Sequence, residues 1–331
     1  MAARLDTPVL GVQDSSAGFG PWQVSLNYRY QKSDRHFRGP EEEENRQAEG
    51  SEVINHINLA EIGIRYSPNP QWSFSLNIPY LMAERSSPLR DSNRVVVDRS
   101  VVEANELSDI TLSARRLLWK PQDHPNGNLA FGLGIKLPTG KHDVYDDRTR
   151  LVNGQRVTTY ESVDQSIQPG DGGWGAIVDA QLFQRIGQSG GMFYLSGTYL
   201  INPEGTNGTP TFRGNVGEEV MSIADQYVAR IGASYSRTSW RGLGLSLGGR
   251  LEGVPVEDLI GDSDGFRRPG YAISAEPGLS YTRGAYNFSL AVPIALYRNR
   301  TRSVPDRMVP GRQGDAAFAD YVVMVGFGQR F

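Results

Sequence analysis

The feature that most constrains this chain is an alternation of apolar and polar residues with a period of two. From position 22 to position 30, the apolar side of the pattern is Trp22, Val24, Leu26, Tyr28 and Tyr30. The same pattern recurs in about eleven further windows, at 60–66, 72–80, 110–114, 129–137, 174–182, 193–199, 227–235, 243–251, 271–281, 286–296 and 321–331. A period of two places successive side chains on opposite faces of a β-strand. The sequence therefore predicts about twelve strands, each with one apolar face.

The connections between these windows alternate in length. The short ones are 67–71, 120–127, 188–191, 237–241 and 282–285, and the long ones are 32–53, 84–106, 139–172, 202–224, 253–269 and 298–315. Strict alternation places all the long loops at one end of an up-and-down meander. Bacterial outer-membrane barrels have this arrangement, with short periplasmic turns and long extracellular loops. We therefore expect an all-β fold, a transmembrane up-and-down antiparallel β-barrel of about 12 strands.

Aromatic residues of the apolar face support a position in a membrane. One group lies at the short-turn ends of the windows: Trp22, Tyr66, Trp72, Tyr235, Tyr281, Tyr286 and Phe331. A second group lies at the long-loop ends: Tyr30, Tyr80, Trp174, Tyr199, Tyr227, Tyr271 and Tyr321. Tyr and Trp are amphipathic and sit at the headgroup level of a bilayer, so two aromatic belts with aliphatic residues between them fit a lipid-facing surface. A soluble β-sandwich shares the alternation but does not require both belts.

Composition excludes several classes of protein. Hydrophobic residues make up 38% of the chain and the mean hydropathy is -0.43, which is too polar for a helical membrane protein. A net charge of -3 argues against a nucleic-acid partner, whose binding surface would be basic and clustered. The chain has no cysteine, which excludes disulfides, thiolate metal sites, cysteine nucleophiles and covalent haem attachment.

The two ends of the chain suggest how the barrel is bounded. The last window ends on Phe331, which predicts that the final strand pairs with the first near Trp22 and leaves no exposed edge. We assign 21–331 to an outer-membrane β-barrel and 1–20 to an N-terminal periplasmic or plug segment. The N-terminus lacks the apolar core of a signal peptide. We expect a signal peptide to have been removed and the mature protein to lie in the bacterial outer membrane.

Three segments resemble those of known proteins. A terminal Phe on an alternating strand, as at Phe331, resembles the signal by which outer-membrane barrels reach their assembly machinery. "GLGIKLPTGKHD" (132–143) and "QPGDGGWG" (168–175) look like paired motifs of the bacterial outer-membrane channels associated with meta-pathway phenol degradation. In that family the first motif ends a strand, a long loop follows, and the second motif opens the next strand. The resemblance implies a barrel fold and a transport function, with no catalytic residues.

Motifs of enzymes and of metal sites are present only in part. "GLSLG" (244–248) fits G-x-S-x-G, but it lies inside an alternating window rather than at a strand–turn–helix junction. "GIKLPTGK" (134–141) has five residues between its glycines where a phosphate loop has four. The four histidines, His36, His56, His124 and His142, fall in or beside expected loops without metal-ligand spacing. We expect no catalytic residue, no metal and no cofactor.

The face opposite the apolar one carries charges of both signs. The residues predicted to line a pore and contact a substrate are Arg29, Glu61, Arg65, Asp109, Arg115, Lys136, Asp179, Arg185, Arg230, Arg250, Glu252 and Glu276. Unpaired charges in a dry interior are very costly, so these must be hydrated or paired. Two interpretations stay open: a pore that selects small polar or anionic solutes, or an ion-pair network that fills the barrel. Loop 140–172 or residues 1–20 would act as the gate.

The function predicted here is passive conduction of small polar, anionic or aromatic solutes by an outer-membrane channel or transporter. Expected partners are outer-membrane lipid and lipopolysaccharide, the barrel assembly machinery through Phe331, and a small-molecule solute, with the protein a monomer or weak homo-oligomer. An aromatic solute would require an apolar lining, whereas the inward face is polar except at Leu81, Ile177, Phe183 and Met324. The alternatives are a barrel-embedded enzyme that modifies lipid or lipopolysaccharide, for which His56 is the candidate, and a structural scaffold for a partner.

Overall fold

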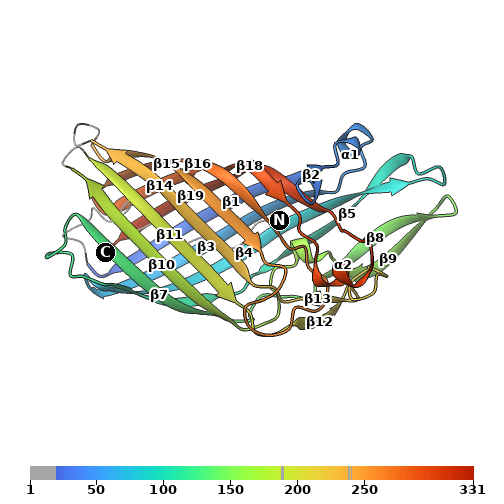
Figure 1. Cartoon of the computed structure of the whole chain (residues 1–331), viewed down its shortest axis with the longest axis horizontal. Coiled ribbons are helices and arrows are strands. Elements are labelled where there is room, and N and C mark those ends of the chain that lie inside the picture. The colour runs from blue at the N-terminus through green and yellow to red at the C-terminus, as the bar shows by residue number, and fades with distance from the viewer. Residues whose placement is uncertain (1–19, 188–189, 238, 240) are drawn as a thin grey trace.

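The structure is a computed structural model that describes residues 20–187, 190–237, 239 and 241–331. Its main element is a closed antiparallel barrel of twelve strands, which confirms the predicted fold (Figure 1). The wall consists of β1 (Trp22–Arg38), β3 (Ile54–Asn69), β4 (Trp72–Arg90), β6 (Thr111–Leu117), β7 (Gly127–Lys136), β10 (Gly175–Ile186), β11 (Gly191–Ile201), β14 (Gln226–Ser236), β15 (Leu243–Val254), β16 (Gly270–Arg283), β17 (Tyr286–Ala291) with β18 (Ile294–Asn299), and β19 (Ala316–Arg330).

The last strand closes the barrel against the first, as the chain's apolar ending predicts. β19 pairs antiparallel with β1, with Leu26 opposite Phe327. The backbone N–H of Phe331 donates to the carbonyl of Trp22 at 2.8 Å. Closure satisfies the backbone groups of both strands, which lipid could not do. Of the predicted N-terminal segment 1–20, all but Gly20 lies outside the described residues.

The outer face of the barrel is apolar and edged by aromatic pairs. Leu133, Leu247 and Leu296 are 63–71% exposed in this isolated chain, a level that fits contact with lipid. The Trp22 and Tyr66 rings lie tilted against each other at the short-turn end, with centroids 4.6 Å apart, and the Tyr199 and Tyr227 rings stack at the long-loop end, with centroids 6.3 Å apart. Among the described residues, no helix is long and apolar enough to cross a membrane.

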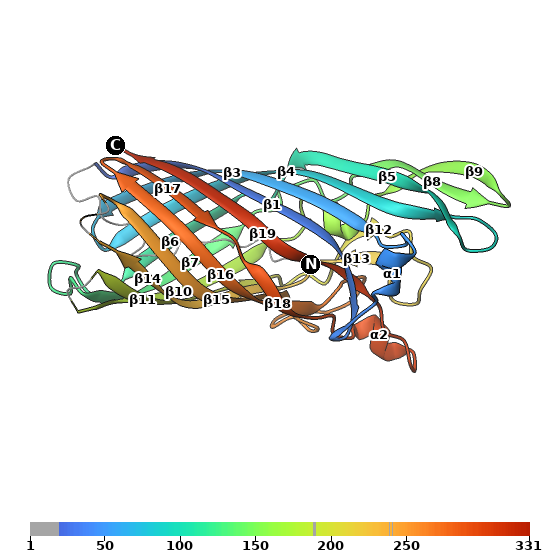
Figure 2. The ribbon, with the colours of Figure 1, turned by 90° about the horizontal axis from the view of Figure 1, so that it is seen from above.

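The segments expected as long loops contain secondary structure. β4 has 19 residues and continues well past Tyr80, where β5 (Val96–Leu107) pairs with it. The hairpin of β8 (Tyr145–Val152) and β9 (Gln155–Ser162) lies beside β5, and together they project beyond the barrel at the long-loop end (Figure 2). The smaller elements at this end are β2 (Glu41–Glu42), α1 (Asn45–Ala48), η1 (Gln165–Ile167), β12 (Thr206–Pro210), β13 (Val220–Ser222) and α2 (Val304–Met308).

The strand expected over 286–296 is broken in two. β17 ends at Ala291 and β18 begins at Ile294, with Pro293 in the gap. Proline has no N–H to donate to a sheet ladder, so a break at this position is expected. Neighbouring strands still bond to the gap: the N–H of Val292 donates to Pro277 and that of Val322 to Pro293, both at 3.0 Å.

Two glycines make room for an aromatic ring inside the barrel. Tyr194, Gly232 and Gly248 are opposite one another on β11, β14 and β15, and Tyr194 is 3% exposed. A Cβ added at Gly248 would lie 2.6 Å from the Tyr194 hydroxyl oxygen and 2.8 Å from the carbonyl oxygen of Ile231. The space that glycine leaves is therefore filled by Tyr194.

We predict that Gly248→Ala destabilises the barrel by about 1–3 kcal/mol, the usual cost of overpacking. Gly197→Ala on β11 is the matched control, because a Cβ there would meet no atom within 4 Å. The measurement is the temperature at which each folded variant loses its compact mobility on a denaturing gel. Equal temperatures for the two variants would show that the packing of Tyr194 does not require a glycine at position 248.

Candidate functional site

An ion-pair network lies inside the barrel at mid-height. Arg250 on β15 is 1% exposed, and its Nη2 lies 2.6 Å from Glu252 Oε2. Its Nη1 lies 3.3 Å from Glu276 Oε2, and Arg230 Nε lies 3.5 Å from the same oxygen in an ion pair. Inward alternation on three adjacent strands, β14, β15 and β16, brings these four predicted residues together. They are paired in the way that burial of charge requires.

Arg29 extends the network across the barrel. Its Nη2 lies 3.5 Å from Glu252 Oε1, although β1 and β15 are separated in the sheet by β16, by β17 with β18, and by β19. The side chains of Arg29 and Glu252 therefore meet over the interior, and both are buried. Because three strand positions separate β1 from β15 in the sheet, this contact spans part of the barrel interior.

A second charged group faces the first from β6, β7 and β10. Arg115 Nε donates to Asp179 Oδ1 at 2.7 Å, and Thr198 donates to Asp179 Oδ2 at 3.2 Å. Lys136 is 4% exposed and forms an ion pair with Asp171. Glu61 on β3 is half-buried and accepts from Asn27 at 3.1 Å.

The remaining predicted residues have other positions. Asp109, between β5 and β6, is half-buried and accepts the backbone N–H groups of Gly140 at 2.9 Å and Asp171 at 3.1 Å, so it fixes both ends of loop 140–172. Arg65 is half-buried on β3, in the part of the strand that approaches the short-turn end. Arg185 is exposed near the short-turn end of β10.

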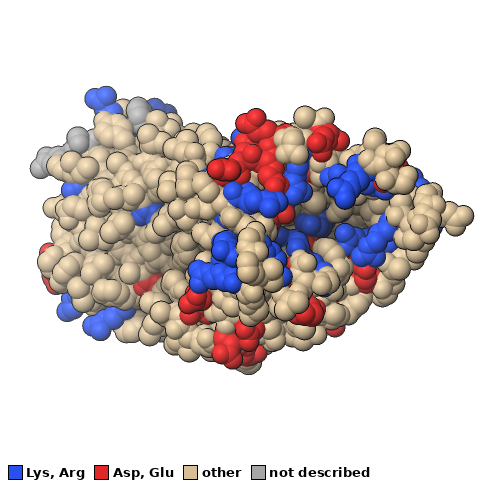
Figure 3. Space-filling view, turned by 45° about the vertical axis from the view of Figure 1, so that its right-hand side comes forward, with Lys and Arg blue, Asp and Glu red and all other residues tan. Residues whose placement is uncertain are grey.

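A cavity of about 570 Å³, here called the mouth cavity, lies in the long-loop half of the barrel. Six of the predicted residues line it: Arg29, Glu61, Asp109, Arg115, Lys136 and Asp179. Ile57, Leu59, Pro79 and Leu81 form an apolar wall in the same cavity. The sequence pattern anticipated only Leu81 of these four, because 57–59 precede the window recognised in β3. In Figure 3 the long-loop end is hollowed and rimmed by charged side chains, whereas the flank of the barrel carries few of them.

The segment 163–171 folds inward over the mouth cavity. After the β8–β9 hairpin the chain turns back, and Val163 and Ile167 are buried at 2% and 0% exposure. They pack with Leu81, Ala83, Val102, Ala104 and Val144, which belong to β4, β5 and the start of the loop. Loop 140–172 thus consists of an outward hairpin and an inward return.

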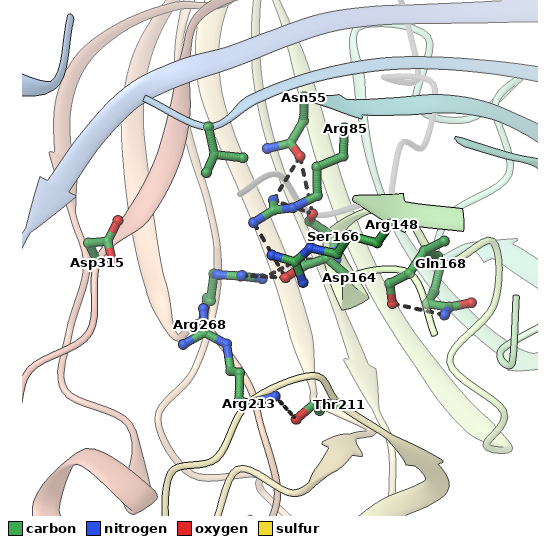
Figure 4. A network of polar contacts seen from close by, with 12 residues as sticks. Asn55, Arg85, Arg148, Asp164, Ser166, Gln168, Thr211, Arg213, Arg268 and Asp315 are labelled. Carbon is green, nitrogen blue, oxygen red and sulfur yellow. Dashed lines mark hydrogen bonds and ion pairs between the residues drawn. The ribbon is translucent and has the colours of Figure 1, made fainter. Parts of the chain in front are cut away.

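Asp164 anchors this return. Its two carboxylate oxygens accept from Arg268 Nη1 and Nη2, both at 2.7 Å, and Arg85 Nη2 lies 3.5 Å away (Figure 4). It also caps η1 by accepting from the N–H of Ser166 at 3.0 Å. Burial alone would raise the pKa of Asp164, but Arg268 and Arg85 hold that pKa well below its usual range. The carboxylate therefore stays ionised in its buried position.

Arginines that the sequence did not single out surround Asp164. Arg85 comes from β4, Arg148 from β8, Arg213 from the connection between β12 and β13, and Arg268 from the connection between β15 and β16. All four line the mouth cavity. Their positions are up to 183 residues apart, from Arg85 to Arg268, so no spacing in the sequence could have grouped them. The only available signal was the number of arginines in the long connections.

Two of the four histidines, His36 and His56, lie within strands, whereas His124 and His142 lie in connections as expected. His36 lies within β1, and its side chain comes close to Glu43 and Asp315, a grouping that could hold a metal ion. Both of its ring nitrogens are already engaged, Nδ1 with Asp315 at 2.6 Å and Nε2 with the N–H of Val53 at 2.9 Å. His56 lies within β3, with Nδ1 3.4 Å from the Tyr30 hydroxyl.

No family model and no curated protein matches this sequence. An outer membrane channel from Pseudomonas putida F1 is similar in structure, with a TM-score of 0.59 and 11% identity over 96% of this chain and 98% of that chain. The β domain of the Bordetella autotransporter BrkA has a TM-score of 0.50 and 12% identity over 94% of this chain and 100% of that domain. At such identities a likeness shows the fold. The chain has the fold of bacterial outer-membrane β-barrels, the class to which its motifs pointed.

Proposed function

We propose that this protein is a channel of the bacterial outer membrane that conducts small solutes passively through its charged interior. The observation that carries the proposal is the mouth cavity of about 570 Å³, which opens at the long-loop end and reaches down to the charged residues at mid-height. The volume lies within the usual range for small-molecule sites, about 300–1,000 Å³. A lipid-facing outer surface around such a cavity fits transport better than it fits a solid scaffold.

In this proposal the long loops are extracellular and the short turns periplasmic, as in other outer-membrane barrels. The exposed band contacts lipid, and the loop charges contact lipopolysaccharide. Phe331 is the residue that the assembly machinery recognises, and the protein acts as a monomer or weak homo-oligomer. Residues 163–171 are the gate, because they cover the mouth cavity and are held by the ion pair of Asp164 with Arg268 and by the packing of Val163 and Ile167.

The twelve residues predicted from the sequence have graded roles in this proposal. Arg29, Glu252, Arg250, Glu276 and Arg230 form the constriction, since the Arg29–Glu252 contact crosses the interior and the other three residues are paired with one another and with Glu252. Glu61, Asp109, Arg115, Lys136 and Asp179 line the path above it. Arg65 and Arg185 lie toward the periplasmic end, beyond the constriction.

The test is single-channel recording of the purified protein in a planar bilayer, first in symmetric salt and then across a salt gradient. We expect a small, steady conductance, because the Arg29–Glu252 contact narrows the passage, and a reversal potential that shows preference for anions, because arginines surround the mouth cavity. A folded, heat-modifiable barrel that conducts no ions at any applied voltage would contradict the proposal.

A further inference from the structure

The arginines around Asp164 outnumber the carboxylates that pair with them. Arg268 uses both terminal nitrogens on Asp164, and Arg85 is held by Asn55 at 2.9 Å and Ser166 at 3.2 Å as well as by Asp164. Glu161 lies 3.2 Å from Arg148 Nη1, but it also accepts from Arg150 Nη2 at 2.8 Å. Glu218 lies 3.4 Å from Arg213 Nη1.

Two further carboxylates near the cluster are committed to other partners. Asp258 pairs with Arg267 at 2.6 Å, and Asp315 contacts Arg46 at 3.0 Å and His36 at 2.6 Å. Three carboxylates, Asp164, Glu161 and Glu218, therefore form the ion pairs of five guanidinium groups. These belong to Arg85, Arg148, Arg150, Arg213 and Arg268. The cluster carries an excess of positive charge next to a cavity.

Arg213 and Arg148 retain unused hydrogen-bond donors. Within the described part of the chain, the Arg213 guanidinium group donates only from Nη1, to Glu218, so its Nη2 carries the donors for a ligand, while its Nε is buried and has no partner. In the same described part, the Arg148 guanidinium group donates to Glu161 alone, from Nη1. Burial lowers the pKa of Arg213, and the neighbouring Arg268 lowers it further, which means that the positive charge is costly where it lies. An anion in the cavity would offset that cost.

Phenylalanine side chains hold these guanidinium groups in place. Arg148 lies over the Phe212 ring with its Cζ 3.9 Å from the centroid, and Arg213 approaches the same ring at 5.9 Å. Arg213 and Arg268 also lie over Phe266, at 4.1 and 4.6 Å. Such stacking uses the flat face of a guanidinium group and leaves its N–H edge for an acceptor. The positions of the donors are therefore set before any ligand arrives.

The mouth cavity offers an apolar surface below these donors. Arg148, Arg213 and Phe212 line the cavity together with Ile57, Leu59, Pro79, Leu81 and Met221. A cavity that combines guanidinium edges with apolar walls suits a molecule that has both a carboxylate and an apolar body. Inorganic phosphate would leave the walls without contacts, and a neutral aromatic molecule would leave the guanidinium groups without an acceptor.

We propose that the mouth cavity is a binding site for small organic monocarboxylates, whose carboxylate is held by Arg213 and Arg148 and whose apolar body lies against Ile57 and Leu59. The inference rests on the proposed function, since it names the class of solute that the channel selects. Binding at this site does not require the constriction below it to open.

The experiment is isothermal titration calorimetry of the folded protein in detergent, with benzoate as the probe. Benzyl alcohol, acetate and inorganic phosphate serve as comparison ligands, because each lacks either the charge or the apolar body. We expect benzoate to bind at least about tenfold more tightly than each of them, which corresponds to the loss of one charge-assisted hydrogen bond or of the apolar contact. Benzoate binding should weaken as salt concentration rises.

Arg213→Gln is the principal variant, because Asn215 still donates to Glu218 at 2.8 Å and the local fold keeps that contact. Arg148→Gln is the second variant, since Arg150 retains Glu161. Each should weaken benzoate binding by about tenfold or more. Arg307→Gln is the matched control: Arg307 is a half-exposed arginine at the same end of the barrel, paired with Glu257 and outside the cavity lining.

The outcomes separate this inference from the proposed function. Equal binding of benzoate and phosphate, equal binding of benzoate and benzyl alcohol, or unchanged binding in both cavity variants would overturn the inference. Ion conductance without benzoate binding would remove the inference and leave the channel. Benzoate binding in a barrel that never conducts would leave the site and remove the channel.

Discussion

Arg29→Ser is expected to increase the single-channel conductance severalfold and to move the selectivity toward cations. Arg29 is the residue of the network that reaches across the interior, with its Nη2 3.5 Å from Glu252. Serine removes both the bulk and the positive charge, so the passage becomes wider and less favourable to anions. The measurement is conductance and reversal potential in planar bilayers under the conditions used for the wild type.

The barrel should remain folded in this variant. Glu252 keeps Arg250 as a partner through two hydrogen bonds, from Nε at 2.8 Å and from Nη2 at 2.6 Å, so no carboxylate is left unpaired. Arg250→Ser would be a poor choice, because it would leave Glu252 and Glu276 buried together with less compensation.

Arg185→Ser is the matched control for this experiment. Arg185 belongs to the same set of inward residues by sequence pattern, but it is exposed and outside the network. We expect it to change conductance much less than Arg29→Ser does. If the two variants conduct alike, or if Arg29→Ser leaves conductance at the wild-type value, the Arg29–Glu252 contact is not the constriction.

Asp164→Asn is expected to release residues 163–171 from the mouth cavity. The change removes the charge that compensates Arg268 and Arg85 in a buried position, and breaking a buried pair in this way costs about 3–5 kcal/mol. The apolar contacts of Val163 and Ile167 with β4 and β5 then remain to hold the segment in place. Among the described residues, Asp164 contacts the strands of the wall only through Arg85, near the long-loop end of β4, so we expect the loop to open while the barrel stays closed.

Two measurements check this expectation. Limited proteolysis of the folded protein should cut within loop 140–172 faster in Asp164→Asn than in the wild type, and single-channel conductance should rise or fluctuate more. Asp147→Asn is the control, because Asp147 is an exposed carboxylate on β8 of the same loop. Unchanged cleavage and conductance in Asp164→Asn would show that the apolar packing alone holds residues 163–171, and that the ion pair of Asp164 is not needed to keep them over the cavity.

The sequence was sufficient to predict the barrel wall. In lipid, every second residue of a strand must be apolar and every backbone group must be hydrogen-bonded within the sheet. The first requirement produces an alternation that can be recognised in short stretches of sequence. Leu26 and Phe327 appear on the same apolar face in the sequence and are paired across the closing seam in the structure. The same local rule identified the inward positions of Arg29, Arg250 and Glu252.

The break between β17 and β18 was not predicted from the sequence. The alternation continues through 286–296, and the proline is only one residue of an otherwise regular window. Secondary structure in the long connections was missed for a different reason. β5, β8 and β9 project beyond the barrel (Figure 2), where no lipid-facing surface requires one apolar face, and their residues alternate less clearly.

By itself the sequence determined how many strands form the barrel wall, which side chains face outward and which face inward, and at which end the long loops gather. Only the tertiary structure decided that Arg29 meets Glu252 over the interior, that Asp164 joins Arg268 from 104 positions away, and that Arg148 and Arg213 share the Phe212 ring. The physical reason is the range of the interactions. Whether a side chain points inward or outward is set by backbone geometry between neighbouring residues. A contact across the barrel depends on the register of every strand between the two partners and on the path of the loops that fold back over the interior.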